Sequence, residues 1–177
     1  CAAAGSISSI AIGEPTSLRD VPRITEASSN AVLFEQPAGC DLPLLANAMA
    51  TRKRWAIALE VDPAQITAEL ARRISKLIPP EHVSSGPVKA VRKIGDEVDL
   101  TRLPAYLQHE LDGAPYISAS MDVTRDPEDG RYNPGMRRLM LRGPRETGVD
   151  LFASSALPRF YRRLRVLHRL FEFAFLL

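Results

Sequence analysis

A turn between two strand-like segments constrains the fold of this chain more than any other feature of its sequence. Residues 126–130 read Asp-Pro-Glu-Asp-Gly, and these residue types strongly favour a tight turn. The flanking segments, residues 115–125 and residues 131–142, both predict strands. We therefore expect an antiparallel hairpin with a polar tip, and a second half of the chain that is rich in β-structure.

The first half of the chain has a different pattern, in which strands alternate with helices. Short runs of β-branched and apolar residues at 5–12 and 31–36 predict two strands. Residues 17–29 predict a weak helix that Pro22 interrupts, and residues 41–59 carry helix formers. Such an alternation is typical of an α/β arrangement.

A clearer helix begins at Asp62, because a carboxylate at the N-cap followed by proline at the first helical position favours helix initiation. Apolar residues recur every three or four positions as far as about residue 78, where two prolines stop the helix: Ile66, Leu70, Ile74 and Leu77. We place a domain boundary after this helix. The predicted fold class is α+β, with an N-terminal α/β domain over residues 1–85 and a β-rich domain over residues 86–177.

The last twenty residues predict an amphipathic helix after Pro158. One face is apolar and the rest is crowded with arginines; the apolar positions are Leu157, Phe160, Leu164, Leu167 and Phe171. The pattern favours packing of the apolar face against a core or a partner over binding of the arginines to an anionic surface. We also interpret the basic run Arg52, Lys53 and Arg54 as a solvated helix face.

Composition limits the classes of function. With 45% hydrophobic and 25% charged residues, the 177-residue chain has an ordinary globular composition, which excludes a disordered tail or a disulfide mini-protein. A net charge of +2 gives no support to nucleic-acid binding, and no apolar run is long enough for a membrane span. Cys1 and Cys40 have no metal or redox spacing, which favours a cytoplasmic protein. Because residue 1 is not methionine, we expect a fragment of a longer chain.

The hairpin holds the most informative residues. Asn133 carries an amide oxygen that can ligate a hard cation, and Gly135 lets backbone N–H groups approach a ligand closely. The adjacent Arg137 and Arg138 could clamp a carboxylate or a phosphate through paired hydrogen bonds. From these residues alone, an anion-binding hairpin and a plain exposed hairpin both remain open.

Several segments resemble motifs of the UbiD family of reversible decarboxylases, and they occur in the family's order. Residues 41–59 resemble the family's N-terminal segment LPVLxNLFGSRERVALAL, and residues 87–104 resemble PVKEV…GDDVDLTRLP. Residues 109–117 resemble HExDGGPYIT. Residues 123–127 and 133–138 resemble VTRDPxTG…RNVGxYR. The sequence is thus similar to that family from about residue 5 to about residue 163.

The resemblance implies a non-oxidative, reversible carboxy-lyase that acts on aromatic or α,β-unsaturated carboxylic acids. Members of the family use prenylated FMN, which a partner flavin prenyltransferase of the UbiX type supplies. The flavin binds in a split β-barrel domain, and its phosphate is held through Mn²⁺ and K⁺. The resemblance further implies that residues 86–177 begin such a barrel, and that the full-length protein is a homo-oligomer.

Roles of individual residues are carried over from matching positions in the motifs. Asn133 matches the asparagine that ligates the metal, and Gly135, Met136 and Arg137 match the loop whose backbone contacts the flavin. Arg138 matches the reaction-site arginine, which would bind the substrate carboxylate. Ser118 lies fifteen residues before Asn133, at the position where the family usually has a threonine near the flavin. Serine keeps the hydroxyl group of that threonine.

The chain also departs from the family pattern. Where the family has its second metal ligand, a histidine, this chain has Ser154 or Ser155, and a hydroxyl is a much poorer ligand for a transition metal than imidazole. The family's metal glutamate and its two reaction-site glutamates lie further along than residue 177. From about Leu164 the sequence no longer follows the motifs, so we expect an atypical C-terminal helix. These departures predict a fragment that is inactive by itself, or alternatively a degenerate, non-catalytic paralogue that serves as an interaction or binding module.

Overall fold

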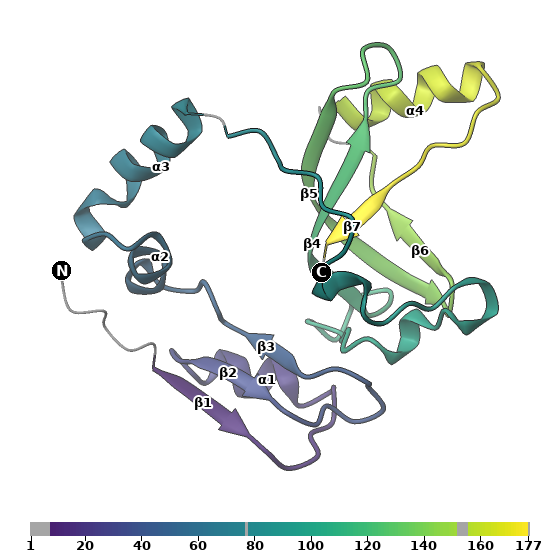
Figure 1. Ribbon diagram of the computed structural model, residues 1–177. Helices are drawn as coiled ribbons and strands as arrows, with labels where there is room; N and C mark the ends of the chain where they lie inside the picture. The colour runs from purple at the N-terminus through teal and green to yellow at the C-terminus, as the bar shows by residue number, and fades with distance from the viewer. Residues whose placement is uncertain (1–7, 77, 152–155, 177) are drawn as a thin grey trace. The chain divides into compact units, whose positions relative to one another are not determined.

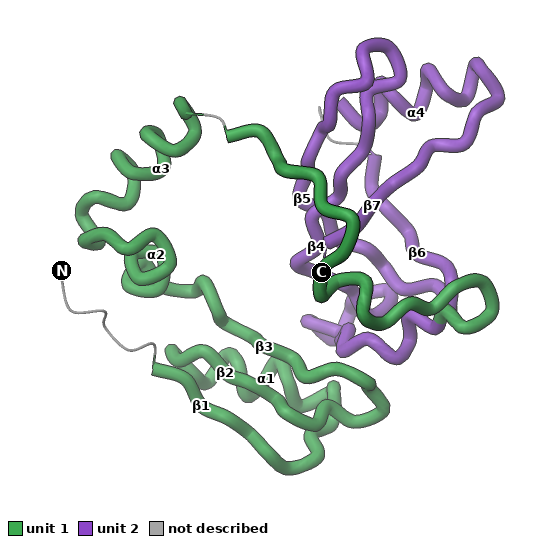
Figure 2. The backbone as a smooth tube through the Cα atoms, in the orientation of Figure 1, with its two compact units in different colours: residues 1–98 green, residues 99–177 purple. Residues whose placement is uncertain are grey.

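The computed structural model describes residues 8–76, 78–151 and 156–176, and it separates into two compact units. Residues 1–98 form the first unit and residues 99–177 the second (Figure 2). The chain is an α+β protein, as the sequence predicts. The boundary between the units falls between Val98 and Asp99. The division into domains at residues 1–85 and 86–177 stays a prediction.

A small three-stranded sheet forms the base of the first unit (Figure 1). Its strands are β1 (Ser9–Ile12), β2 (Ala31–Phe34) and β3 (Leu44–Ala46), and β2 lies in the centre. β1 runs parallel to β2, whereas β3 is antiparallel to it. The central strand is the most buried because it has neighbours on both edges. Strand β3 lies inside the segment for which the sequence predicts only helix formers, so that interpretation is wrong for its first half.

Helix α1 (Val21–Glu26) connects β1 to β2. Pro22 occupies its first turn, where the missing N–H has no helical partner in any case, so the proline begins the helix instead of interrupting it. Val21 is fully buried and forms a core with Val32 and Phe34.

Two further helices follow the sheet. In α2 (Arg52–Leu59), the Thr51 side chain caps the N-terminus by accepting a hydrogen bond from the Arg54 backbone N–H. The predicted helix after Asp62 is present as a 3-10 turn at Pro63–Gln65 that continues into α3 (Ile66–Ser75), and Asp62 accepts a hydrogen bond from the Ala64 N–H as expected of an N-cap.

Of the apolar stripe predicted for this helix, Ile66 is buried, whereas Ile74 is 72% exposed. The predicted Leu77 lies outside the described residues. Residues 78–98 contain only short 3-10 turns, at Pro87–Lys89 and at Gly95–Glu97.

The prediction that Arg54 lies on a solvated helix face is wrong. Its side chain is only 5% exposed, and its guanidinium donates hydrogen bonds to the backbone carbonyls of Asn47 and Ser29. Asn47 in turn donates from Nδ2 to the carbonyls of Thr25 and Ser28, at 2.8 and 3.1 Å. These contacts join the start of α2 to the end of α1, and we call Arg54 and Asn47 the carbonyl clamp.

The second unit is built on a four-stranded antiparallel sheet in the order β6-β5-β4-β7. The predicted hairpin is present: β4 (Tyr116–Arg125) and β5 (Tyr132–Gly143) flank the turn, whose Asp126 N–H donates to the Arg131 carbonyl. β6 (Glu146–Val149) continues the sheet beyond β5, and β7 (Ala174–Leu176) lies against the other edge of β4. Among the described residues, no pairing joins β6 to β7, so this sheet is open.

Helix α4 (Ala156–Val166) packs its apolar side onto the second unit, with Leu157, Phe160 and Leu164 buried. The predicted helix is therefore too long, because the chain after Val166 leaves the helix and returns as strand β7 (Figure 1). Phe171 lies edge-on to Phe160, with 6.3 Å between the ring centroids. No helix in the described part of the chain is long and apolar enough to cross a bilayer.

Candidate functional site

An irregularity in the β4–β5 pairing marks the candidate site. Ile117 pairs with Leu139, but the next pair along the hairpin joins Ser120 to Arg137. Ser118 and Ala119 therefore both stand opposite Arg138, which is the two-against-one pattern of a β-bulge. Bulges occur frequently beside active sites, where they redirect side chains, and this one lies between two residues that the sequence assigns to the site.

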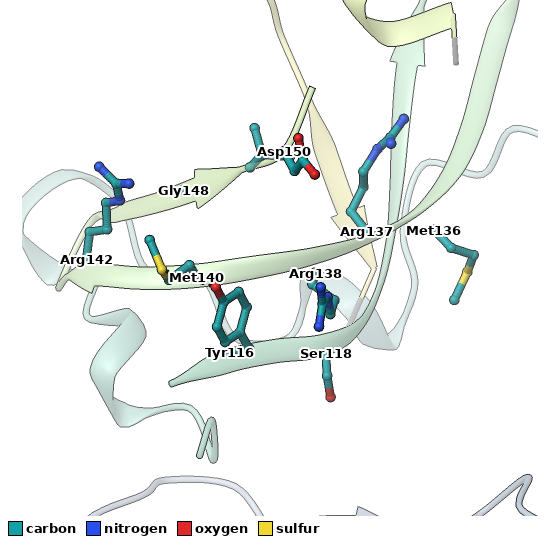
Figure 3. Close-up of a pocket in the computed structure, with 10 residues that line it drawn as sticks. Tyr116, Ser118, Met136, Arg137, Arg138, Met140, Arg142, Gly148 and Asp150 are labelled. Carbon is teal, nitrogen blue, oxygen red and sulfur yellow. Dashed lines mark hydrogen bonds between the residues drawn. The ribbon is translucent and has the colours of Figure 1, made fainter. Parts of the chain in front are cut away.

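The strands around the bulge line an open cavity of about 510 Å³ (Figure 3). Its wall includes four of the residues predicted from the sequence: Ser118, Met136, Arg137 and Arg138. Further lining residues come from β4, β5 and the β6 region: Tyr116, Met140, Arg142, Gly148, Val149 and Asp150. Three arginines and one carboxylate make the wall strongly cationic, so the cavity suits an anionic ligand.

The Tyr116 ring contacts Arg138, the residue predicted to be the reaction-site arginine. The Arg138 guanidinium carbon lies 5.5 Å from the centroid of the Tyr116 ring, within the range of a cation–π contact. The Tyr116 hydroxyl lies 3.3 Å from Sδ of Met140, its partner across the hairpin. In Figure 3, Arg138, Tyr116 and Ser118 lie together, whereas Arg137 leaves β5 in a different direction.

A row of buried polar residues occupies the other face of β4. Ser120, Asp122 and Thr124 alternate along the strand and are almost completely shielded from solvent. Opposite them stand Arg137, Gly135 and Asn133, respectively. We call Ser120, Asp122 and Thr124 the polar row; it lies directly against the segment of β5 that carries the predicted site.

The structure thus divides the predicted residues into two groups. Ser118, Met136, Arg137 and Arg138 line the cavity, whereas Asn133 and Gly135 are not part of its wall and stand opposite the polar row. Two residues of the cavity wall, Tyr116 and Arg142, were not predicted from the sequence. Tyr116 belongs to the segment that resembles HExDGGPYIT, and this resemblance could have indicated it. Arg142 reaches the cavity through the pairing of β5 with β6, which the sequence does not reveal.

The described residues do not form a metal site by themselves. They contain no group of three or more histidine, cysteine, aspartate or glutamate side chains placed to hold an ion. Ser154 and Ser155, which stand at the position of the family's histidine, lie outside the described residues. Asn133 as a metal ligand stays a prediction.

Comparison with family models decides the family. The model of the 3-octaprenyl-4-hydroxybenzoate carboxy-lyase Rift-related domain (UbiD) matches residues 81–174. The model of the N-terminal domain of the same carboxy-lyases matches residues 18–74. This chain belongs to the UbiD family. Because the match extends to residue 174, the interpretation that the sequence leaves the family after about Leu164 is wrong.

Solved structures of UbiD-class enzymes have the same fold. An evolved dimeric form of HmfF from Pelotomaculum thermopropionicum, in complex with prFMN, is 25% identical with a TM-score of 0.85, covering 94% of this chain and 40% of that one. Vanillic acid decarboxylase from Sedimentibacter hydroxybenzoicus, in its closed form, is 25% identical with a TM-score of 0.86, covering 94% of this chain and 39% of that one.

A third structure supports the fold alone, because its sequence is more distant. It is the apo 3,4-dihydroxybenzoic acid decarboxylase AroY of Klebsiella pneumoniae, which is 18% identical with a TM-score of 0.85, covering 97% of this chain and 39% of that one. The UbiD-family chain described here therefore spans about two fifths of the length of these solved enzymes.

Proposed function

We propose that this chain is the N-terminal part of a prenylated-FMN-dependent decarboxylase, acting reversibly and without oxidation on aromatic or α,β-unsaturated carboxylic acids. The observation that carries the proposal is the cationic cavity at the β4–β5 bulge, where Ser118 and Arg138 come together. Two UbiD-class neighbours were solved with prFMN or with FMN, which supports a flavin as the ligand.

The cavity fits such a ligand. Its volume of about 510 Å³ lies in the range of small-molecule and cofactor sites, and its arginines suit a phosphate or a carboxylate. Met136 and Arg137 lie in its wall, and Gly135 precedes them on β5. These residues, with the Ser118 hydroxyl, would hold the flavin.

Arg138 would bind the substrate carboxylate and orient it. A guanidinium presents two parallel N–H groups that match the two oxygens of a carboxylate, and the Tyr116 ring restricts the directions that the guanidinium can take. When bound, prenylated FMN supplies the electron sink for the loss of CO₂. The task of Arg138 is then to hold the carboxylate in place until the carbon–carbon bond breaks.

The remaining parts of the proposal concern partners. A flavin prenyltransferase of the UbiX type would supply the cofactor, and the full-length protein would form a homo-oligomer in the cytoplasm. Mn²⁺ and K⁺ would accompany the flavin phosphate in the complete protein, and Asn133 would supply one ligand to the metal.

Flavin binding tests the proposal directly. The purified 177-residue chain is titrated into FMN, and then into prenylated FMN, while flavin fluorescence is followed. We expect saturable quenching by the wild type and a large loss of affinity in Arg142→Ala, which removes a cation from the cavity wall. The matched control is Arg145→Ala, which changes an arginine in the same β5–β6 region outside the cavity wall. No saturable binding of either flavin would contradict the proposal.

Turnover by the isolated chain is expected to be absent. It spans about two fifths of the solved enzymes, so groups contributed by the rest of such a protein are lacking from the assay. The measurement is CO₂ release from cinnamate- and hydroxybenzoate-type acids with prenylated FMN supplied. Detectable release would show that the chain is a complete enzyme and would overturn this part of the proposal.

A second candidate function, a non-catalytic interaction module, has support from exposed apolar residues near the end of the chain. Leu170 is almost completely exposed, and Leu167 and Leu176 are at least half exposed. Size-exclusion chromatography separates the two candidates. A chain that binds no flavin and co-elutes with a full-length UbiD-family protein is an interaction module, whereas flavin bound to the chain alone supports the enzyme.

A further inference from the structure

A buried carboxylate lies beneath the candidate site without belonging to the cavity wall. Asp122 is 0% exposed, and its Oδ1 atom lies 3.2 Å from Nε of Arg137. Within the described part of the chain, neither carboxylate oxygen accepts a hydrogen bond. Burial of a charge with so little compensation is unfavourable, and such groups in folded proteins call for a specific reason.

The site strand is shaped to receive this carboxylate. A Cβ atom at Gly135 would lie only 2.8 Å from Oδ1 of Asp122, closer than side chains approach. The same Cβ would lie 3.4 Å from Nη2 of Arg137. The absence of a side chain at Gly135 therefore creates the space in which Asp122 and Arg137 meet.

The neighbours of Asp122 in the polar row hold the same stretch of β5. The Ser120 hydroxyl donates to the Arg137 carbonyl at 2.9 Å, and the Thr124 hydroxyl donates to the Asn133 carbonyl at 3.3 Å. Asp122 lies between these two contacts and adds a charged one, directed at the side chain of Arg137. Three alternate residues of β4 thus hold two residues of β5, Arg137 twice and Asn133 once.

Adjacent residues of a strand point to opposite faces, so the direction of Arg137 determines that of Arg138. We propose that Asp122 is a positioning residue: by holding the Arg137 side chain, it sets the direction of Arg138 toward the Tyr116 ring. This inference rests on the proposed function, in which Arg138 binds the substrate carboxylate. Figure 3 shows the two guanidinium groups leaving β5 in different directions.

The test replaces the charge and keeps the shape. Asp122→Asn is compared with Asp129→Asn, which removes a carboxylate from the exposed tip of the same hairpin. Two quantities are measured on the 177-residue chain: the NMR signal of the Arg138 Nε–H group, assigned through Arg138→Lys, and the dissociation constant for FMN. The signal reports the contact of Arg138 with the Tyr116 ring and does not depend on any ligand.

In Asp122→Asn we expect the Arg138 signal to move toward that of a solvated arginine. We also expect the FMN dissociation constant to rise on the order of tenfold, because Asp122 holds Arg137, which belongs to the segment that would contact the flavin. Asp129→Asn should leave both unchanged. If Asp122→Asn is folded and its Arg138 signal matches the wild type, the inference is overturned.

A second variant covers the case in which Asp122→Asn does not fold. Asp122→Asn combined with Arg137→Met removes both charges and leaves none buried alone. The inference requires the Arg138 signal to move in this double variant as well, and an unchanged signal overturns it. Failure of the proposed function is a separate result. If the wild type binds no flavin, the Arg138 signal can still be compared between the wild type and Asp122→Asn.

Discussion

The two units of this protein bury arginines in opposite ways. In the first unit, the carbonyl clamp surrounds Arg54 with backbone oxygens, and Asn47 completes the network with two further hydrogen bonds. In the second unit, Arg137 meets the buried Asp122 at 3.2 Å, while the carboxylate oxygens accept no hydrogen bond from the described residues. The Arg54 guanidinium donates two hydrogen bonds to backbone carbonyls, whereas the Asp122 oxygens accept none from the described residues.

This difference indicates a structural role for the carbonyl clamp and a role near the candidate site for Asp122 and Arg137. A buried guanidinium that donates to backbone carbonyls fixes the local structure. A buried pair with unfilled acceptors is less favourable, and it lies next to the strand that carries Arg138. We therefore expect substitutions in the carbonyl clamp to affect stability, and substitutions around Asp122 to affect stability and flavin binding together.

The largest effect is expected for Arg54→Met. This change keeps the length and the apolar stem of the side chain but leaves the carbonyls of Ser29 and Asn47 without their donor. Loss of charge-assisted hydrogen bonds that leave buried acceptors unpaired should lower the free energy of unfolding by about 3 kcal/mol. Urea unfolding measures it, with Lys53→Met on the exposed side of the same helix as the control.

The affinity of the folded Arg54→Met variant for FMN should equal that of the wild type. A change in unfolding free energy of less than about 0.5 kcal/mol, the range of ordinary surface substitutions, would refute the description of the clamp as scaffold.

The next largest effect is expected for Gly135→Ala. The added methyl group would lie 2.8 Å from Oδ1 of Asp122, so the carboxylate must move away from Arg137. Overpacking of this kind typically costs about 1–3 kcal/mol of unfolding free energy. Gly143→Ala is the matched control, because a Cβ there meets nothing within 4 Å.

A double-mutant cycle sharpens this prediction. Because the clash is with Asp122, the cost of Gly135→Ala should fall when Asp122→Ala is already present. If the losses of unfolding free energy in Gly135→Ala and Asp122→Ala add up in the double variant, the effect of Gly135→Ala does not come from a clash with the Asp122 carboxylate.

How far the sequence could predict these features depends on how local they are. The hairpin was predictable because the turn at residues 126–130 determines it within a few positions. The burial of Arg54 was not, since its acceptors include a carbonyl twenty-five residues away at Ser29. The bulge opposite Arg138 depends on the register between two strands, which no local pattern reveals.

The same reasoning applies to the site residues. The motif resemblance carried Ser118 and Arg138 to positions that the structure brings to one cavity, because family motifs encode three-dimensional positions that spacing alone does not. Asp122 has no such signal: in the sequence it is one polar residue in a strand, and only its burial against Gly135 indicates a role.

A smaller effect is expected at Tyr116. Replacement by leucine removes the ring beneath Arg138 and with it a contact worth about 0.5–1 kcal/mol at such sites. Tyr116→Phe is the control, because it keeps the ring and loses only the hydroxyl contact with Met140. Thermal unfolding and the Arg138 Nε–H signal should both change in Tyr116→Leu and remain near wild type in Tyr116→Phe. If Tyr116→Phe changes both quantities as much as Tyr116→Leu, the hydroxyl, not the ring, orients Arg138; if neither variant changes them, Tyr116 does not orient Arg138.

The smallest effect concerns Glu69, a half-buried carboxylate of the first unit whose two arginine partners are exposed, and it sets the baseline for the comparison. Hydrogen bonds from Arg72 and Arg73 lower the pKa of Glu69 from 4.5 to about 2. A pKa lowered by folding means that the unfolded chain binds a proton more readily. The contribution of Glu69 to stability is therefore present above pH 4.5 and is lost as the pH falls toward 2.

Because both partners of Glu69 lie at the surface, water and salt screen the interaction. Glu69→Gln should thus lower the melting temperature only slightly at pH 7, and the difference from the wild type should disappear near pH 2. Glu81→Gln, a change at an exposed glutamate, is the control and should give no such pH-dependent difference. If NMR instead shows that the Glu69 carboxyl titrates near pH 4.5, the ion pairs with Arg72 and Arg73 do not form in solution. If Glu69→Gln destabilised the protein as much as Gly135→Ala does, ion pairs with exposed partners would be as important for stability as the buried pair of Asp122 and Arg137.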